Sequence, residues 1–90
     1  MNNENVSSRI QAFIVQRFPA AKKKLVNEDV PLLESGIIDS LGTLEVVGFL
    51  EHSFNIKVED EELSPENFST LRGLASFVEK KRQQVEAVAR

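Results

Sequence analysis

The sequence predicts an all-α fold, a small bundle with three long helices and one short helix. Apolar residues recur at helical spacing in three separate stretches of the 90-residue chain. The only stretch that alternates like a strand, Ile56–Val58, is too brief to found a sheet. A chain of this length forms one small domain on a single core, so we expect one domain over residues 1–90.

The first long helix is expected to begin near Val6 and to end before Pro19. Proline lacks an N–H group and disfavours helical geometry in the residue before it. Ser7 or Ser8 is a candidate N-cap, and residues 1–5 are expected to fray. The helically spaced apolar residues of this segment are Val6, Ile10, Phe13, Ile14 and Phe18.

A loop is predicted from Pro19 to Asp39, because this stretch holds two prolines, a glycine and only scattered apolar residues. So long a loop in a compact domain indicates a functional segment. The basic run Lys22–Lys24 is expected to be a solvated part of this loop. The residues expected to pin the loop to the core are Leu25, Val30, Leu32, Leu33 and Ile37.

The second long helix is predicted over Ser40–Phe54, with Asp39 as its N-cap. Ser40 then lies in the first turn, beside unsatisfied backbone N–H groups at the positive end of the helix dipole. That environment suits a phosphate attached to the serine. The only histidine, His52, lies toward the other end of the helix, so Ser40 is predicted to be modified rather than catalytic.

This second helix separates into two faces when its residues are projected at 100° each. The face expected toward the core holds Thr43, Val46, Val47, Leu50 and Phe54. The nearly opposite face holds Leu41, Leu44, Glu45, Gly48 and His52. One interpretation is a partner-docking surface with an apolar centre and a rim of Glu45, Glu51 and His52. The other is that the long loop covers Leu41 or Leu44 as ordinary packing.

Two further helices complete the predicted bundle. A short turn of helix is expected over Ser64–Phe68, where Pro65 suits the first helical position. The last long helix is expected from Thr70 to Arg82, and residues 83–90 either extend it or fray. The inner residues of this last helix are Leu71, Leu74, Ala75, Phe77 and Val78.

Composition excludes several classes of function. The chain has no apolar run long enough for a membrane span, and its N-terminus lacks the pattern of a signal peptide, so we expect a cytoplasmic protein. It has no cysteine, which excludes disulfides, a cysteine nucleophile and a thiolate metal site. It also lacks a glycine-rich phosphate loop and a Ser/His/Asp constellation, so we expect no enzymatic activity.

Charge is distributed asymmetrically along the chain. Residues 39–66 carry eight acids against the single base Lys57, a balance of −7, whereas the rest of the chain is positive. Such a field repels nucleic acid and favours basic protein surfaces. The run Glu59–Glu62 lacks the ligand spacing and glycine of an EF-hand, so a solvated or partner-facing surface is the favoured interpretation.

The segment Gly36–Glu45 resembles the attachment motif of acyl carrier proteins and of related stand-alone peptidyl or aminoacyl carrier proteins. The resemblance extends from about Leu32 to Lys81. It implies an up-down four-helix bundle with a short third helix, and a 4′-phosphopantetheine arm transferred from coenzyme A to Ser40. Asp39 and Leu41 complete the motif, and the resemblance implies that Asp39 helps the transferase recognise it. The arm would supply the thiol that this chain lacks.

The sequence departs from the carriers of fatty-acid biosynthesis at four positions of the second helix. Those carriers usually have an acid where Gly42 stands, a bulky apolar residue at Gly48, a small residue at Phe49 and often an acid at His52. We expect these departures to remove acidic or bulky groups from the docking surface, and we expect Phe49 to narrow or reshape the space beside the core. They favour a dedicated carrier of acyl or aminoacyl thioesters, in lipid or secondary-metabolite biosynthesis, over a general carrier.

The resemblance also implies partners. These are a phosphopantetheinyl transferase, an acyl- or aminoacyl-activating ligase and downstream acyl-processing enzymes, with the carrier itself a monomer. A rival from another class is a non-covalent helical interaction module without a prosthetic group. A third interpretation, a calcium-responsive module, rests on the acidic run alone.

Overall fold

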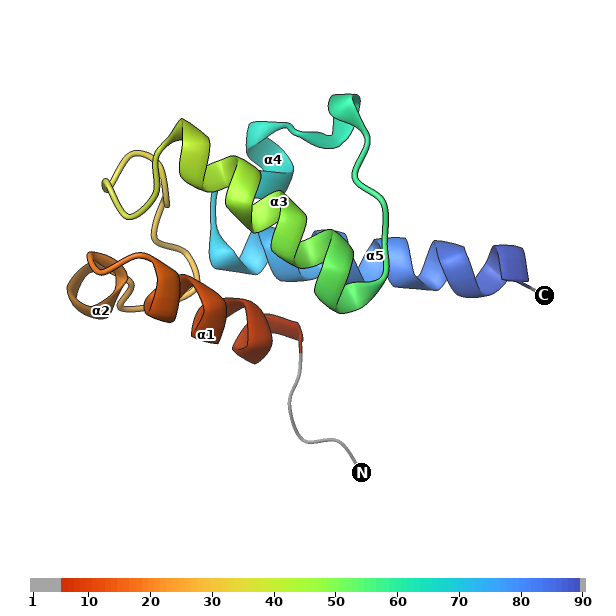
Figure 1. The fold of residues 1–90 in the computed structure, drawn as a ribbon, viewed down its shortest axis with the longest axis horizontal. Coiled ribbons are helices and arrows are strands. Elements are labelled where there is room, and N and C mark those ends of the chain that lie inside the picture. Colours follow the sequence, from red (N-terminus) through yellow and green to blue (C-terminus); the bar gives the residue numbers. More distant parts are fainter. Residues whose placement is uncertain (1–5, 90) are drawn as a thin grey trace.

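The all-α prediction is confirmed by a computed structural model, which describes the backbone of residues 6–89 and the side chains of 6–65 and 67–83. The described residues form helices and no strand (Figure 1). The three long helices are α1 (Val6–Arg17), α3 (Ser40–Phe54) and α5 (Leu71–Ala89).

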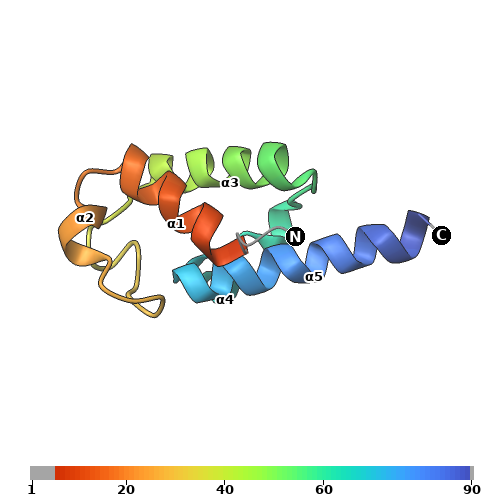
Figure 2. The ribbon, with the colours of Figure 1, turned by 90° about the horizontal axis from the view of Figure 1, so that it is seen from below.

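The long helices surround a single apolar core. Helix α1 packs against both α5 and α3, and the end of α5 extends past the other helices in both views (Figures 1 and 2). Each long helix contributes fully buried aliphatic side chains because its apolar residues fall on one face. The largest of these side chains in the long helices are Ile10, Ile14, Val46, Leu50, Leu71, Leu74 and Val78.

Shorter elements connect the long helices. Helix α4 (Pro65–Phe68) begins with proline at its first position, as predicted. The sequence missed α2 (Ala21–Lys24) and the 3-10 turn η1 (Asp60–Glu62), so the part of the chain that the structure describes has two short α-helices instead of one. Helix α2 forms where Ala21 is buried against the core, and η1 is closed by reciprocal hydrogen bonds between Glu59 and Glu62.

The ends of α1 and α5 also differ from expectation. Helix α1 already begins at Val6, so Ser7 and Ser8 lie inside the helix and do not cap it. The Ser7 hydroxyl instead donates a hydrogen bond to Glu28 at 2.8 Å, which ties α1 to the loop. Helix α5 continues to Ala89, and residues 1–5 lie outside the described part of the chain.

The segment between α2 and α3 is anchored along its length. Leu25, Leu32 and Ile37 are buried as predicted, but Leu33 is 48% exposed, contrary to expectation. The Leu32 N–H donates to the Ser69 carbonyl at 2.7 Å, which fixes the middle of the loop beside α4. The exposed side chains of Arg72 and Asp29 pair at 2.7 Å, and this guanidinium lowers the pKa of Asp29.

Aromatic rings fill the interface between α1 and α3. Phe13 and Phe49 stack with their centroids 4.2 Å apart, and Phe18 and Phe54 meet this pair edge-on at 6.2 and 6.0 Å. Such offset and edge-to-face pairs add about 0.5–1.5 kcal/mol each beyond area burial. Phe49 thus fills space beside the core, as expected, but it does not alter the docking surface, because its ring packs between the two helices.

We predict that Phe49→Ala lowers the free energy of unfolding by about 2–3 kcal/mol, less than a fully buried phenylalanine because this ring is half-buried. The neighbouring variant Gly48→Ala is the matched control. A Cβ at Gly48 meets nothing within 4 Å, so alanine should raise helix stability by up to about 1 kcal/mol. Urea unfolding followed by circular dichroism measures both. Equal effects of the two variants would contradict this packing.

Candidate functional site

Ser40 is the first residue of α3, and Asp39 caps the helix as predicted. Asp39 has an extended backbone, and its Oδ1 atom accepts a hydrogen bond from the Gly42 N–H at 2.7 Å. Its carbonyl accepts the first helical hydrogen bond, from the Thr43 N–H at 2.9 Å. Ser40 is exposed, so its hydroxyl faces solvent at the positive end of the helix dipole.

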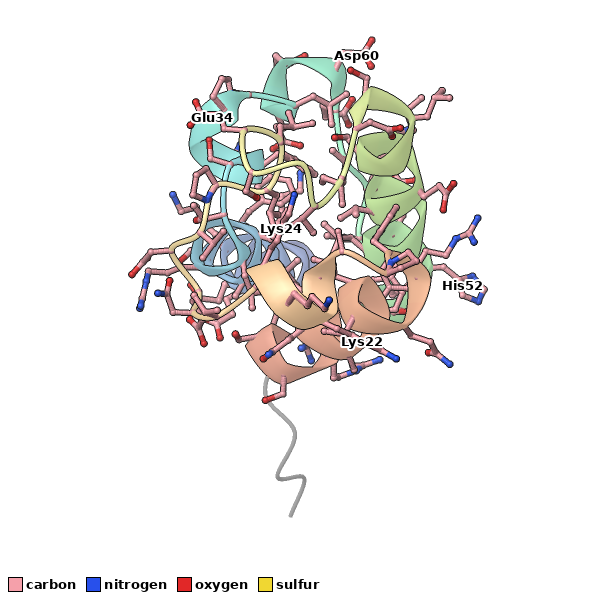
Figure 3. The ribbon with its side chains drawn as sticks, turned by 90° about the vertical axis from the view of Figure 1, so that its left-hand side faces the viewer. Lys22, Lys24, Glu34, His52 and Asp60 are labelled. Carbon is pink, nitrogen blue, oxygen red and sulfur yellow. The ribbon has the colours of Figure 1, made fainter. Side chains whose placement is uncertain are left out.

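Buried side chains and hydrogen bonds hold the loop before Ser40 in place. Ile37 and Ile38 are 3% and 5% exposed, and both of their N–H groups donate to the Leu32 carbonyl, at 3.0 and 3.2 Å. Gly36 adopts φ +83°, a left-handed conformation that favours glycine. Lys24 on α2, which is labelled in Figure 3, donates a hydrogen bond to the Ser35 carbonyl at 2.9 Å. Ser40 therefore follows a fixed turn.

Gly42 packs directly beneath the end of α1. It is buried, and a Cβ atom there would lie 2.9 Å from Cε1 of Phe18 and 3.2 Å from Cβ of Ile38. A real side chain is not accommodated at that separation, so an acidic residue at this position would displace Phe18. The expectation that Gly42 changes the docking surface is wrong, since Gly42 belongs to the interface between α1 and α3.

The outward face of α3 is apolar at its first two turns. Leu41 is 72% exposed and Leu44 is 59% exposed, so the loop does not cover either side chain. Gly48 faces open space, and His52 projects away from the bundle (Figure 3). The division of this helix into two faces was therefore predicted correctly.

The two acids expected at the rim of this face have partners within the chain. The Glu45 carboxylate lies 2.5 Å from Nε of Arg17, at the end of α1. Glu51 is half-buried, and its carboxylate accepts a hydrogen bond from the Val58 N–H at 2.8 Å. Glu51 thus holds the segment that follows α3.

The acidic run forms the tip around η1. Glu62 accepts a hydrogen bond from the Glu59 N–H and pairs with Lys81 at 3.1 Å, and these contacts lower the pKa of Glu62. Asp60 is exposed at the tip (Figure 3). Among the described residues, the structure shows no group of three or more acids or histidines that could hold a metal ion.

An apolar cleft of about 310 Å³ lies beside the first turns of α3. Thr43, three residues after Ser40, lines the cleft on the side of α3. Most of the lining of the cleft is apolar. The apolar lining residues are Pro31, Leu33, Leu63, Pro65 and Phe68. The cleft was not predicted from the sequence, although Leu63, an apolar residue directly after the acidic run, is a signal for it.

Comparison with known proteins identifies the family of this chain. The family model described as "phosphopantetheine attachment site" matches residues 9–78, which include Ser40, all of α3 and parts of α1 and α5. The chain belongs to this phosphopantetheine attachment family. Domains of this family carry a 4′-phosphopantetheine group. Carrier proteins of this family are not enzymes.

Curated relatives are also carriers. The D-alanyl carrier proteins of Streptococcus pyogenes serotype M5 (strain Manfredo), serotype M49 (strain NZ131) and serotype M1 are each 33% identical over 72 residues. Each alignment covers 78% of this chain and 91% of the relative. This similarity spans the bundle as well as the motif.

A solved structure gives a further match. A chain in a structure described as "Crystal structure of FAD-dependent dehydrogenase" superposes with a TM-score of 0.67 at 26% identity. The match covers 77% of this chain and 97% of that chain. No helix in the described part of this chain is long and apolar enough to cross a membrane.

The residues at the start of α3 fit the prosthetic group of the family. Attachment requires an accessible hydroxyl that accepts a phosphodiester, and Ser40 is exposed at a helix N-terminus where a negative phosphate is stabilised. The Asp39 cap and the anchored turn at Gly36 fix where this hydroxyl lies.

We predict that Asp39→Ala lowers the free energy of unfolding by about 1 kcal/mol, because the Gly42 N–H loses its acceptor. Asp39→Asn should retain most of that stability, since asparagine also caps helices well. Urea unfolding of both variants measures the difference. A loss in Asp39→Asn as large as that in Asp39→Ala would mean that the charge, and not the cap, is what stabilises α3.

Proposed function

We propose that this chain is a stand-alone carrier whose Ser40 bears the 4′-phosphopantetheine arm and transports a small aminoacyl or acyl group. The observation that carries the proposal is the exposed Ser40 at the capped start of α3, in the motif Asp39-Ser40-Leu41. Membership of the attachment family supports the arm, and the D-alanyl carrier relatives support an aminoacyl cargo.

Ser40 and its two neighbours each have a separate role in presenting the arm. The Ser40 Oγ atom supplies the phosphodiester oxygen, Asp39 holds the first turn of α3, and Leu41 beside it offers an apolar contact to the enzyme that attaches the arm. Once attached, the group provides a thiol on which cargo is carried as a thioester. Because the chain has no cysteine of its own, no second thiol competes for that cargo.

A small cargo fits the packing of this bundle better than a long fatty acyl chain. The stacked rings of Phe13 and Phe49 occupy the space between α1 and α3. The apolar cleft of about 310 Å³ beside Thr43 is open to the outside and close to Ser40 in sequence. We propose D-alanine or another small amino acid as the cargo, and a dedicated role rather than general fatty-acid elongation.

Partners are proposed to dock on the outward face of α3. Leu41 and Leu44 form its apolar centre, and Glu45, Gly48 and His52 surround them, with Glu51 at the margin. A docking surface with an apolar centre and a polar rim is typical of protein interfaces. The expected partners are a phosphopantetheinyl transferase, an aminoacyl-activating ligase and a downstream enzyme, met by a monomeric carrier in the cytoplasm.

The solved structure suggests a second candidate for the downstream enzyme. The matching chain belongs to a structure described as an FAD-dependent dehydrogenase. A flavin-dependent dehydrogenase that acts on carrier-bound cargo is therefore an alternative to a transferase that only passes the cargo on. Both alternatives use the same arm on Ser40 and the same face of α3.

We predict that incubation with coenzyme A and a broad-specificity phosphopantetheinyl transferase adds one group of about 340 Da to the chain. Ser40→Ala should abolish this addition and leave the circular dichroism spectrum nearly unchanged, because Ser40 is exposed. Ser76→Ala, at an exposed position on α5, is the matched control and should be modified like the wild type. Intact mass spectrometry measures the added mass on the wild type and on both variants.

Modification that persists in Ser40→Ala would overturn the site. A wild-type chain that gains no mass with any transferase would instead favour the rival function, a non-covalent interaction module.

A further inference from the structure

An ion pair lies at the edge of the proposed docking face. Nε of Arg17 is 2.5 Å from Oε1 of Glu45, and the two side chains are 58% and 42% exposed. Leu41 and Glu45 are four residues apart on α3, so they share one face of the helix. A protein that contacts Leu41 therefore meets Arg17 and Glu45 together.

The fold fixes this arrangement. Phe18 packs on Gly42, which brings the C-terminal end of α1 against the first turn of α3. Arg17 is the last residue of α1, so its guanidinium reaches the docking face at this point. A groove of about 360 Å³ runs between the two helix ends, and Arg17, Asp39, Leu41 and Glu45 all line it.

The pair changes the charge that a partner encounters. Glu45 is matched by Arg17, and the carboxylate of Glu51 is turned toward the Val58 N–H. Gly48 and His52 contribute no carboxylate to the face. Asp39 is a further exposed acid of the groove, and its Oδ1 atom accepts a hydrogen bond from the Gly42 N–H. The exposed acids Asp60 and Glu61 belong to η1, which lies away from the start of α3 (Figure 1). Arg17 thus reduces the negative charge of the apolar face around Leu41 and Leu44 by pairing with Glu45.

We propose that Arg17 determines the partner specificity of this carrier. By pairing with Glu45, it selects enzymes whose docking surfaces are apolar and nearly neutral, and it discriminates against strongly basic surfaces. The inference rests on the proposed function, in which enzymes dock on α3. Its physical basis is that a charge near an interface steers association and suppresses wrong partners, while the apolar centre provides the contact.

The test measures kcat/KM for attachment of the arm from coenzyme A by a transferase that serves the acidic carriers of fatty-acid synthesis. Arg17→Ala should raise kcat/KM at low salt roughly twofold to fivefold, the scale of one exposed ion pair. High salt should remove this gain, because exposed charges are screened. Glu45→Gln should lower kcat/KM below the wild-type value, since it leaves Arg17 facing a basic enzyme.

Two controls isolate the pair. Lys23→Ala makes the same change in net charge at an exposed position on α2 and should behave like the wild type. The double variant Arg17→Ala/Glu45→Gln should also have the wild-type kcat/KM, because it removes the guanidinium of Arg17 without leaving an unpaired carboxylate at position 45. Arg17→Gln keeps part of the side-chain stem, and it should reproduce the gain of Arg17→Ala if loss of the guanidinium is the cause. Thermal unfolding verifies that each variant is folded.

Equal rates for Arg17→Ala and Lys23→Ala would overturn the inference, as would a gain that survives in the double variant or at high salt. These outcomes leave the carrier function standing, because the arm is still attached. Failure of the wild type and of every variant to accept the arm, from this transferase and from a broad-specificity transferase alike, would overturn the carrier function and this inference together.

Discussion

The contact between Phe18 and Gly42 sets the geometry on which the rest of the site depends. Only a residue without a Cβ atom allows the Phe18 ring to approach the first turn of α3 this closely. That approach brings the end of α1 beside Asp39, whose side chain caps the same turn through the Gly42 N–H. One glycine therefore serves both the packing of two helices and the cap that places Ser40.

The site combines a rigid base with an exposed reactive group. Buried Ile37 and Ile38, and their hydrogen bonds to the Leu32 carbonyl, hold the turn that leads into α3. Ser40, the next residue after the cap, is free of the core and faces solvent. A carrier needs this combination, because its arm must reach several enzymes while its docking surface keeps one shape.

Local patterns in the sequence predicted the features that depend on neighbours along the chain. The cap by Asp39, the start of α3 at Ser40 and the position of Leu41 and Leu44 on the outer face of that helix all follow from residues within a few positions of one another. Pro65 marked the start of α4 for the same reason, since proline at the first helical position loses no hydrogen bond.

Features that depend on contacts across the bundle escaped the sequence analysis. Gly42 looked like a surface position because helical projection does not show that Phe18 lies above it. Glu45 looked like a free rim acid because its partner Arg17 is 28 residues away. Helix α2 was taken for loop because its four residues are too few to show a helical period, and the burial of Ala21 stabilises it instead.

The central claim is that a preformed bundle presents an external arm at Ser40. The most direct test compares ¹H–¹⁵N correlation spectra of the labelled protein before and after attachment of the arm. If the bundle is preformed, we expect shift changes confined to the turn from Gly36 and the first turns of α3. Shift changes spread through core residues such as Ile10 and Phe49 would contradict it, because they would mean that the bundle rearranges around the arm.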